Sequence, residues 1–394
     1  MNNVNKTFNM QRSTASQRTS CLLIVYIILH VGVITQAKEP VISQDSVISD
    51  ISHVSSSNTT YRNFYGSKDN NKPNFPKTMP RIIPCPEAGD IWPCECYPID
   101  NTTMDINCSN VTSEGQLRYV FSREFPFQNF RNFIIRGNFH VNALREGDLG
   151  PCSFVSIDIR DSALIIIDNL ALERSYNTLE ALVLINNNIR YIPDISPFSR
   201  LNRLDFQYNA LTEFPFLNSS TLQTLILRGF PFEVIPPTAT LYLPALAYAD
   251  FAYCHLTEIS PGTFTQNAQL SYLELGSNRL TSIPRDTFRL NGTNNTLLLQ
   301  YNQINDVHPD AFSGITGKLT MNSNRLQELQ EEIWRPLLDA NVMLYIAGNS
   351  FTCGCDIAWI ILNPTLLYRV HDEATCFTGQ KFVELDPAWY INMC

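Results

Sequence analysis

A nine-residue pattern decides the fold, and it reads LSYLELGSN at residues 270–278, LEALVLINN at 179–187 and LNRLDFQYN at 201–209. In each stretch, leucine or phenylalanine stands at positions one, four and six, and asparagine stands at position nine. In the same register, copies begin at residues 130, 154, 179, 201, 222, 246, 270, 294, 316 and 341. Ten copies of one pattern indicate a repeat architecture, in which each repeat packs chiefly against its neighbours.

The spacing and the alternation of the pattern identify the kind of repeat. Copies follow one another at intervals of 21 to 25 residues, which lie in the range of leucine-rich repeats. The alternating leucines form a short strand, whose apolar side chains point inward while the residues between them point outward. We therefore predict an α/β leucine-rich-repeat solenoid of about ten repeats. Its parallel sheet lines the concave face, and its convex side is mostly irregular.

The asparagine at position nine serves the turn that follows each strand. An inward-facing amide there can satisfy backbone groups that no strand partner reaches. Most copies have it, at Asn138, Asn187, Asn209, Asn278, Asn302, Asn324 and Asn349. Three copies have Ser162, Phe230 or Cys254 instead. Serine and cysteine replace an amide in part and phenylalanine cannot, so we expect an irregular turn near Phe230.

A second apolar group follows each strand, and in three repeats a phenylalanine comes five residues after it. These residues are Phe264, Phe288 and Phe312, and we expect them to stack as a hydrophobic spine on the convex side. A solenoid of this kind exposes its core at both ends unless a cap covers each end.

Two cysteine clusters lie where the caps are needed. They comprise Cys85, Cys94, Cys96 and Cys108 before the first repeat, and Cys353, Cys355, Cys376 and Cys394 after the last. Such clusters form disulfides outside the cell or zinc sites inside it, but neither has paired Cys-x2-Cys units. We predict disulfide-bonded caps, at residues 85–129 and at 349–394 with the last repeat, around repeats at 130–348. Each disulfide would contribute about 3–4 kcal/mol.

The N-terminal region predicts export. Residues 1–37 have a polar start with basic residues, an apolar stretch from Leu22 to Thr35 and small residues at Thr35 and Ala37, as in a signal peptide. The alternative is an uncleaved signal anchor. About 14 apolar residues are too few to span a bilayer, which needs about 20, and we expect no membrane insertion if the signal is cleaved. Residues 38–84 are polar, and we expect a disordered extension.

Glycosylation motifs favour the same compartment. Asn-x-Ser/Thr triplets begin at Asn58, Asn101, Asn110, Asn218, Asn291 and Asn294. No later segment is long and apolar enough to act as a membrane anchor. We predict a secreted, extracellular glycoprotein.

Composition and motifs exclude other classes of function. The formal net charge is -9 and there is no basic run, so we expect no nucleic-acid partner. The histidines outside the signal are scattered, and none lies in a nucleophile or metal motif. There is no glycine-rich phosphate loop. We therefore predict no enzymatic activity, no cofactor and no metal.

The concave face is the expected binding surface, because extended concave surfaces are what solenoids offer to partners. Its outward positions are the third, fifth, seventh and eighth of each copy, where tyrosine and arginine, which often anchor interfaces, recur. The candidate residues are Arg203, Asp205, Tyr208, Arg228, Tyr248, Asp250, Tyr253, Tyr272, Glu274 and Tyr301. Position five carries Asp158, Asp205, Asp250 and Glu274, which predicts an acidic stripe flanked by tyrosines. The alternative is an ordinary solvated strand face.

Two cysteines of the repeats stand apart from both clusters. Cys152 and Cys254 are about four repeats apart, too far for a disulfide, whose Cα atoms lie within about 7 Å. We expect Cys254 to be a buried thiol at position nine. For Cys152 a buried thiol and a bond to another chain both remain open.

The repeats and the two cysteine clusters together resemble the extracellular leucine-rich-repeat proteins with cysteine-rich flanks, the class of Slit, chaoptin and Toll-like ectodomains. The resemblance covers about residues 85–394. It implies the pairs Cys85–Cys96, Cys94–Cys108, Cys353–Cys376 and Cys355–Cys394. The N-terminal cap, with residues 92–96 (WPCEC) and 108–110 (CSN), is also similar to arthropod proteins named as the non-catalytic subunit of oplophorus-luciferin monooxygenase. That likeness implies a secreted protein without catalytic activity.

Three hypotheses of function remain from the sequence. The chain is an extracellular recognition or adhesion protein that binds a protein partner, a non-catalytic subunit of a secreted enzyme such as an oxygenase, or a receptor held by an uncleaved N-terminal segment. The fold does not identify the ligand, because repeat arrays host unrelated functions.

Overall fold

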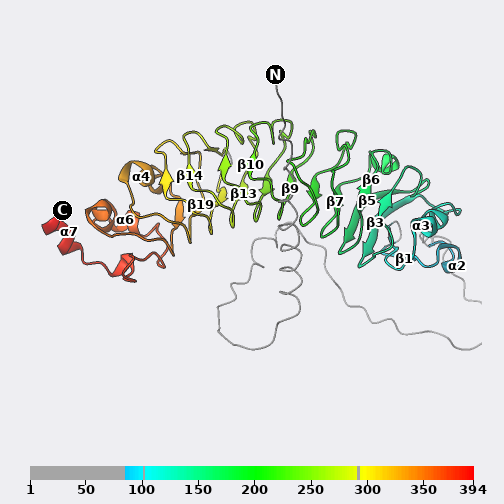
Figure 1. Cartoon of the computed structure of the whole chain (residues 1–394), viewed down its shortest axis with the longest axis horizontal. Helices are drawn as coiled ribbons and strands as arrows, with labels where there is room; N and C mark the ends of the chain where they lie inside the picture. The colour runs from blue at the N-terminus through cyan, green and yellow to red at the C-terminus, as the bar shows by residue number, and fades with distance from the viewer. Residues whose placement is uncertain (1–84, 101–102, 291–292) are drawn as a thin grey trace, which may run out of the picture. The chain divides into compact units, whose positions relative to one another are not determined.

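The computed structural model describes residues 85–100, 103–290 and 293–394. The predicted signal peptide and polar extension, and the glycosylation motifs at Asn58, Asn101 and Asn291, lie outside the described residues. Within the described part, one curved array carries a twelve-stranded sheet along its concave side (Figure 1). Its strands, in spatial order, are β1 (Glu95–Pro98), β2 (Met104–Asn107), β3 (Asn129–Arg136), β5 (Ser153–Arg160), β7 (Ala181–Val183), β8 (Arg203–Asp205), β9 (Thr224–Ile226), β11 (Tyr248–Asp250), β13 (Tyr272–Glu274), β16 (Thr296–Leu298), β19 (Lys318–Thr320) and β20 (Met343–Tyr345).

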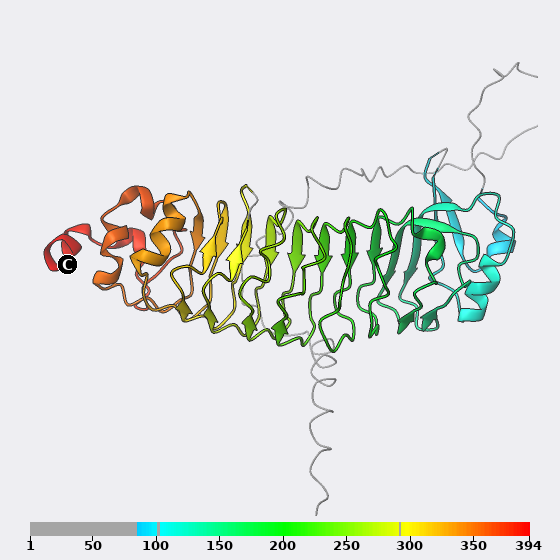
Figure 2. The same ribbon diagram turned by 90° about the horizontal axis from the view of Figure 1, so that it is seen from above.

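The register of this sheet confirms the ten predicted repeats. Position three of each copy pairs with position three of the next, as in Tyr248 with Tyr272, and Thr296 with Lys318. All neighbours are parallel except β1 and β2, which form an antiparallel hairpin ahead of the first repeat. Figure 2 shows the strands side by side along the array.

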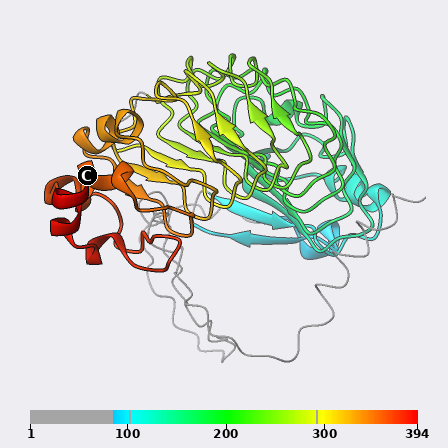
Figure 3. The same ribbon diagram turned by 60° about the vertical axis from the view of Figure 1, so that its left-hand side comes forward.

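The convex side consists mostly of loops with four short two-stranded sheets (Figure 3). They pair β4 (Ala143–Leu144) with β6 (Ile166–Ile167), β10 (Val234–Ile235) with β12 (Glu258–Ile259), β14 (Ser282–Ile283) with β17 (Asp306–Val307), and β15 (Phe288–Arg289) with β18 (Phe312–Ser313).

The phenylalanine spine is confirmed on this side of the array. The rings of Phe264 and Phe288 stack with their centroids 6.5 Å apart, and those of Phe288 and Phe312 at 5.9 Å. The spine continues into Trp334, whose ring lies 6.2 Å from Phe312. Trp334 comes from α4 (Glu331–Asp339), so this helix carries the packing of the spine into the C-terminal cap.

The asparagines of position nine form a hydrogen-bonded ladder that links neighbouring repeats. The Asn278 amide donates to the carbonyls of Phe251 and Leu275, both at 2.9 Å, and its oxygen accepts from the backbone N–H of Cys254 at 2.8 Å and of Leu256 at 3.1 Å. One side chain thus satisfies four buried backbone groups in two repeats.

The three copies without asparagine differ as their side chains require. The Ser162 hydroxyl accepts from Asn138 N–H at 3.1 Å and donates to the Arg160 carbonyl at 2.7 Å. At Phe230 the turn is irregular, as predicted: Phe232 N–H donates to the Phe230 carbonyl two residues back at 3.0 Å, and Glu233 has a φ of +57°.

The N-terminal cap consists of the β1–β2 hairpin, α2 (Ala88–Ile91) and α3 (Glu114–Phe121). Ser113 caps α3 by accepting a hydrogen bond from the Gln116 N–H, and Leu117, Val120 and Phe121 face the core. The hairpin extends the repeat sheet by pairing β2 with β3. Disulfides join Cys85 to Cys96 and Cys94 to Cys108, the pairs that the resemblance implied.

The C-terminal cap is helical and follows the last repeat. It comprises η3 (Cys355–Ile357), α5 (Ala358–Ile361), α6 (Pro364–Leu367), η4 (Phe382–Glu384) and α7 (Pro387–Met393). One more short 3₁₀ helix, η2 (Glu173–Ser175), lies within the repeat array and does not belong to the cap. Disulfides join Cys353 to Cys376 and Cys355 to Cys394, again as the resemblance implied. Among the described residues, no helix has the length and apolar character needed to cross a membrane.

Candidate binding face

The ten candidate residues lie together on the concave face of five neighbouring repeats, from β8 to β16. Arg203, Asp205, Tyr248, Asp250, Tyr272 and Glu274 stand within strands β8, β11 and β13. Arg228, Tyr208, Tyr253 and Tyr301 stand in the turns directly after β9, β8, β11 and β16. Strand alternation and register place the six residues within the strands on the predicted side. The other four lie in turns beyond the strands, where alternation does not decide the side.

The carboxylates of position five are buried, and the acidic stripe that the sequence predicts is not exposed. Asp205, Asp250 and Glu274 are only 1%, 3% and 6% exposed. Larger outward-pointing neighbours cover these shorter side chains, because adjacent strands of a sheet lie only about 4.8 Å apart. The sequence pattern thus predicted the positions of these carboxylates but not their burial.

Each buried aspartate of the column is paired with an arginine. Asp205 accepts from Arg203 at 2.8 Å and from the Gln207 amide at 3.1 Å. Asp250 accepts from Arg228 at 2.7 Å. Pairing is what makes a buried carboxylate tolerable, since an isolated buried charge is strongly unfavourable.

The same arrangement continues toward the N-terminal cap, beyond the ten candidate residues, where the sequence pattern already places Asp158 at an outward position. Asp158 of β5 is ion-paired with both Arg136 and Arg160. Asp105 of β2 is ion-paired with Arg131 at 2.9 Å. The sequence contains a sign of these ion pairs. Arg136 and Arg160 stand at position seven of the first two repeats, and Asp158 stands at position five of the second.

Glu274 differs from the aspartates because no arginine pairs with it in the ion pairs of the described chain. Its carboxylate accepts from the Gly276 N–H at 2.6 Å and from the Gln300 amide at 3.2 Å. Burial raises the pKa of Glu274 to about 7, opposed by the Gly276 hydrogen bond and reinforced by the charge of Asp250. This group therefore titrates near neutral pH, unlike an exposed glutamate.

Tyr248 and Tyr272 form a stacked pair above this buried layer. Their rings are nearly parallel, at an interplanar angle of 5°, with centroids 4.4 Å apart. Burial raises the pKa of Tyr248 to about 12 and that of Tyr272 further in the same direction. Both hydroxyls thus remain protonated at physiological pH.

Three exposed tyrosines have an unfavourable backbone conformation. Tyr208, Tyr253 and Tyr301 have φ values of +56°, +58° and +57° and are 46%, 53% and 63% exposed. Every repeat has a positive φ at this eighth position, but the repeats between them use Gly229 and Ser277. A bulky residue in the left-handed region costs roughly 1–2 kcal/mol. Such strain at an exposed aromatic residue is a reason to look for function there.

The small residues between the tyrosines leave room for the rings. A Cβ atom at Gly229 would lie 2.6 Å from Cδ1 of Tyr208, so the Tyr208 ring lies across this glycine. The guanidinium of Arg228 lies 5.8 Å from the ring centroid of Tyr253, within the range of a cation–π contact. The tyrosines and arginines of the face therefore contact one another across repeats.

In the part of the chain that the structure describes, Cys152 and Cys254 are the two cysteines outside the disulfides, and both are buried. Cys254 occupies position nine as expected, and its thiol donates to the Leu227 carbonyl at 3.0 Å. Burial raises the pKa of each thiol to about 12, which keeps both protonated and unreactive. Burial favours the buried-thiol interpretation of Cys152 over a bond to another chain.

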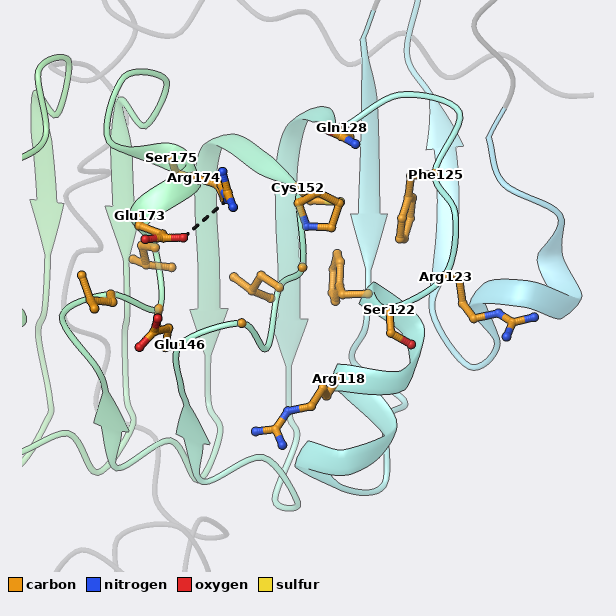
Figure 4. Close-up of a pocket in the computed structure, with 18 of the residues that line it drawn as sticks. Arg118, Ser122, Arg123, Phe125, Gln128, Glu146, Cys152, Glu173, Arg174 and Ser175 are labelled. Atoms are coloured by element: carbon orange, nitrogen blue, oxygen red, sulfur yellow. Dashed lines mark ion pairs between the residues drawn. The ribbon is translucent and has the colours of Figure 1, made fainter.

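Apart from the concave face, the surface has a pocket near the N-terminal cap with a volume of about 710 Å³ (Figure 4). It is enclosed by the end of α3, the loop after it and the segments that precede β5 and β7. Phe121, Phe125 and Leu149 line it, while Glu146 and the ion-paired Glu173 and Arg174 stand at its margin. Sequence reasoning did not predict this pocket. Among the described residues, no group of three or more histidine, cysteine or acidic side chains could hold a metal ion.

Comparisons with known proteins agree with the fold. Residues 268–326 match the family model described as leucine rich repeat. The chain is 36% identical over 324 residues to the Oplophorus-luciferin 2-monooxygenase non-catalytic subunit of Oplophorus gracilirostris, which covers 81% of this chain and 90% of that protein. The fold of the present chain is similar to that of a chain in the octameric complex of Latrophilin 3, Unc5D and FLRT2 (LRR). The TM-score is 0.60 and the sequence identity is 21%, over 74% of the present chain and 91% of that chain. The non-catalytic name of the relative and the repeat fold support the expectation that this chain is not an enzyme.

Proposed function

The chain belongs to the leucine-rich-repeat family of the Oplophorus-luciferin 2-monooxygenase non-catalytic subunit, and we propose that it is a secreted protein that binds a partner protein through its concave face. The observation that carries this proposal is the row of exposed tyrosines Tyr208, Tyr253 and Tyr301. Large, rigid aromatic side chains are enriched at the energetic centres of protein interfaces. The eighth position is left-handed in every repeat, and these three repeats have a bulky aromatic residue where their neighbours have Gly229, Ser277 or Ser323.

Secretion is supported by the cysteine chemistry. Eight cysteines form four disulfides, two in each cap, and such bonds persist in oxidising compartments. Three of the predicted glycosylation sites, Asn110, Asn218 and Asn294, are exposed and accessible to the modifying enzyme.

A second candidate function is that of a non-catalytic subunit of a secreted enzyme. It is favoured by the relative, which bears that name and aligns over 90% of its own length. In this case the partner on the concave face is the enzyme itself.

The test is affinity capture of the tagged protein from its native secretions, in parallel with a Tyr253→Ser/Tyr301→Ser variant. Serine stands at the equivalent position in neighbouring repeats, at Ser277 and Ser323, with φ values of +56° and +55°. The variant therefore removes two rings without imposing a new backbone conformation. The matched control is Tyr191→Ser/Tyr368→Ser, whose tyrosines are 73% and 84% exposed and lie outside the concave-face positions.

A partner lost from the first variant and kept by the control supports the proposal, and its identity distinguishes a recognition protein from an enzyme subunit. If both variants keep the partner, the binding site is not at these tyrosines. If the native protein captures no specific partner, the proposed function is wrong.

A further inference from the structure

Four arginines of the concave face have partly exposed side chains above buried aspartates. The side chains of Arg136, Arg160, Arg203 and Arg228, here called the arginine row, are 57%, 40%, 42% and 31% exposed. Beneath them, the side chains of Asp158, Asp205 and Asp250 are 12%, 1% and 4% exposed. An approaching molecule therefore meets guanidinium groups first, and the four arginines and three aspartates together carry a formal charge of +1.

Two other acids lie near the row, and Asp161 among them is exposed. Asp161 accepts a hydrogen bond from the Asn186 amide at 2.6 Å, and Glu180 is ion-paired with Arg200 at 2.6 Å. Glu274, on β13, is buried. The groups exposed directly above the acidic column are thus guanidinium groups, in contrast to the carboxylates that the sequence pattern suggests.

From this charge distribution we propose that the arginine row binds an extended acidic segment of a partner protein. The inference rests on the proposed function and names the chemistry of the partner. Each guanidinium has five N–H donors, of which an underlying aspartate takes only one or two. The planar group can hold a second carboxylate with its remaining donors, and charge-assisted hydrogen bonds of this type are among the strong ones.

The dimensions of the row fit a short peptide segment. Arg136, Arg160 and Arg228 stand at position seven of their repeats and Arg203 at position three, and all four guanidinium groups reach aspartates of position five. They come from β3, β5, β8 and the turn after β9, so the row crosses four strand spacings, or about 19 Å. An extended chain covers this length with about six residues. Since alternate side chains of an extended chain point to the same side, about three carboxylates would face the row.

The surface between the arginines is partly apolar, although the exposed Asp161 directly follows Arg160. At the centre of the row, β7 presents Ala181 and Val183, and Ile185 follows it. Toward the C-terminal end, Arg228 contacts Tyr253, which links the row to the exposed tyrosines. An acidic segment that ends in aromatic or apolar residues would use both parts of the face.

The experiment measures binding of fluorescent peptides to the full secreted protein by anisotropy. The probe is an alternating Glu–Gly peptide, and the comparison peptides are Gln–Gly and Lys–Gly of equal length, with a heparin oligosaccharide as a non-peptide polyanion. We expect saturable binding of the Glu–Gly peptide, weakened at high sodium chloride, and little binding of the other two peptides.

Two variants test the row without leaving a buried charge unpaired. Arg136→Gln leaves Asp158 paired with Arg160, and Arg203→Gln/Asp205→Asn removes both members of one pair. Each should weaken Glu–Gly binding about tenfold, the effect of one hydrogen bond to a charged group. The control Arg285→Gln removes a 68% exposed arginine that pairs with Asp310 outside this face and should change nothing. Circular dichroism melts verify that all variants fold.

Binding of Gln–Gly as tight as Glu–Gly, a preference for Lys–Gly, or binding of heparin alone would each overturn the inference. So would equal loss in the Arg285 control and the row variants. If no peptide binds while the native protein still captures its partner, the inference fails and the proposed function stands. If the Glu–Gly peptide binds through the row but no partner is captured from the secretions, the proposed function fails instead.

Discussion

At the scale of single residues, the concave face combines features that do not favour stability. Tyr208, Tyr253 and Tyr301 have left-handed backbone conformations that glycine, asparagine or aspartate adopt more readily. Glu274 is buried without a cation paired to it among the described residues. Proteins retain local strain and buried charge mainly where function needs them. These residues are therefore the ones whose replacement should separate stability from binding.

The tyrosine rings should contribute little to folding. We expect the Tyr253→Ser/Tyr301→Ser variant to keep its melting temperature within a few degrees of the native protein, since exposed substitutions rarely change stability by more than about 0.5 kcal/mol. The measurement is a thermal melt followed by circular dichroism. A large drop would show that the rings stabilise the array, and loss of partner in the capture experiment could then not be assigned to binding.

Glu274 should make stability depend on pH. Its pKa is about 7 in the folded protein against an ordinary value of 4.5, so between these two values the unfolded chain releases a proton that the folded chain keeps. Stability then falls as pH rises from 4.5 to 7 and is level above 7. At about 1.4 kcal/mol for each pH unit between the two pKa values, this contribution is at most roughly 3 kcal/mol.

The variant that tests this is Glu274→Gln, which keeps an oxygen to accept from Gly276. We expect its stability relative to the native protein to increase between pH 4.5 and 7, as measured by urea unfolding across that range. Glu213→Gln, at an exposed glutamate, serves as the control and should follow the native curve. Parallel curves for Glu274→Gln and the native protein would contradict the raised pKa.

At the scale of elements, the asparagine ladder joins strands that are too short to hold by themselves. Most strands of the repeats have only three residues, and their turns leave backbone groups without strand partners. Asn278 satisfies four such groups, and Asn302 and Asn324 act in the same way in the following repeats. The turn near Phe230 has no such amide, and there the Phe232 N–H donates to both the Phe230 and the Cys254 carbonyls.

Removal of one amide should therefore have a large effect. We expect Asn278→Ala to reduce the free energy of unfolding by about 3 kcal/mol, since several buried donors and acceptors lose their partner at 1–3 kcal/mol each. Urea unfolding of this variant is compared with Asn188→Ala, an exposed asparagine one residue after the ladder position. A loss below about 1 kcal/mol would mean that water replaces the amide.

At the scale of the whole molecule, the array depends on its ends. Each repeat contacts its neighbours, so the first and last repeats would expose core without a cap. The spine that begins at Phe264 ends on Trp334 beneath the C-terminal cap. Phe351 of the last repeat packs on Phe382 of the cap, with ring centroids 5.5 Å apart.

Loss of a cap disulfide should therefore loosen the array from one end. The bond between Cys355 and Cys394 closes 39 residues, and the chain-entropy model assigns it about 4 kcal/mol. In a Cys355→Ser/Cys394→Ser variant, we expect faster amide hydrogen exchange in β19 and β20 than in the native protein, and unchanged exchange in β3 and β5. Uniformly faster exchange along the array would indicate that the described unit unfolds as one.

The sequence by itself determined the repeat fold, the register of the strands, the spine and the place of the caps. These follow from residue spacing, because each repeat folds against a neighbour of nearly the same sequence. It also predicted Tyr208, Tyr253 and Tyr301 at outward positions of the pattern. A period of two tells which face a side chain lies on, but not how deeply its neighbours cover it.

Only the tertiary structure decided how deeply each side chain is buried, and therefore which charged groups a partner meets at the surface. Asp205 and Arg203 are two residues apart and point to the same face, yet the short carboxylate is buried and the long guanidinium is exposed. Asp250 is covered by Arg228 from the preceding repeat. An arginine side chain is longer than an aspartate side chain and keeps its charged end in water, so a column of acids in the sequence becomes a row of arginines at the surface.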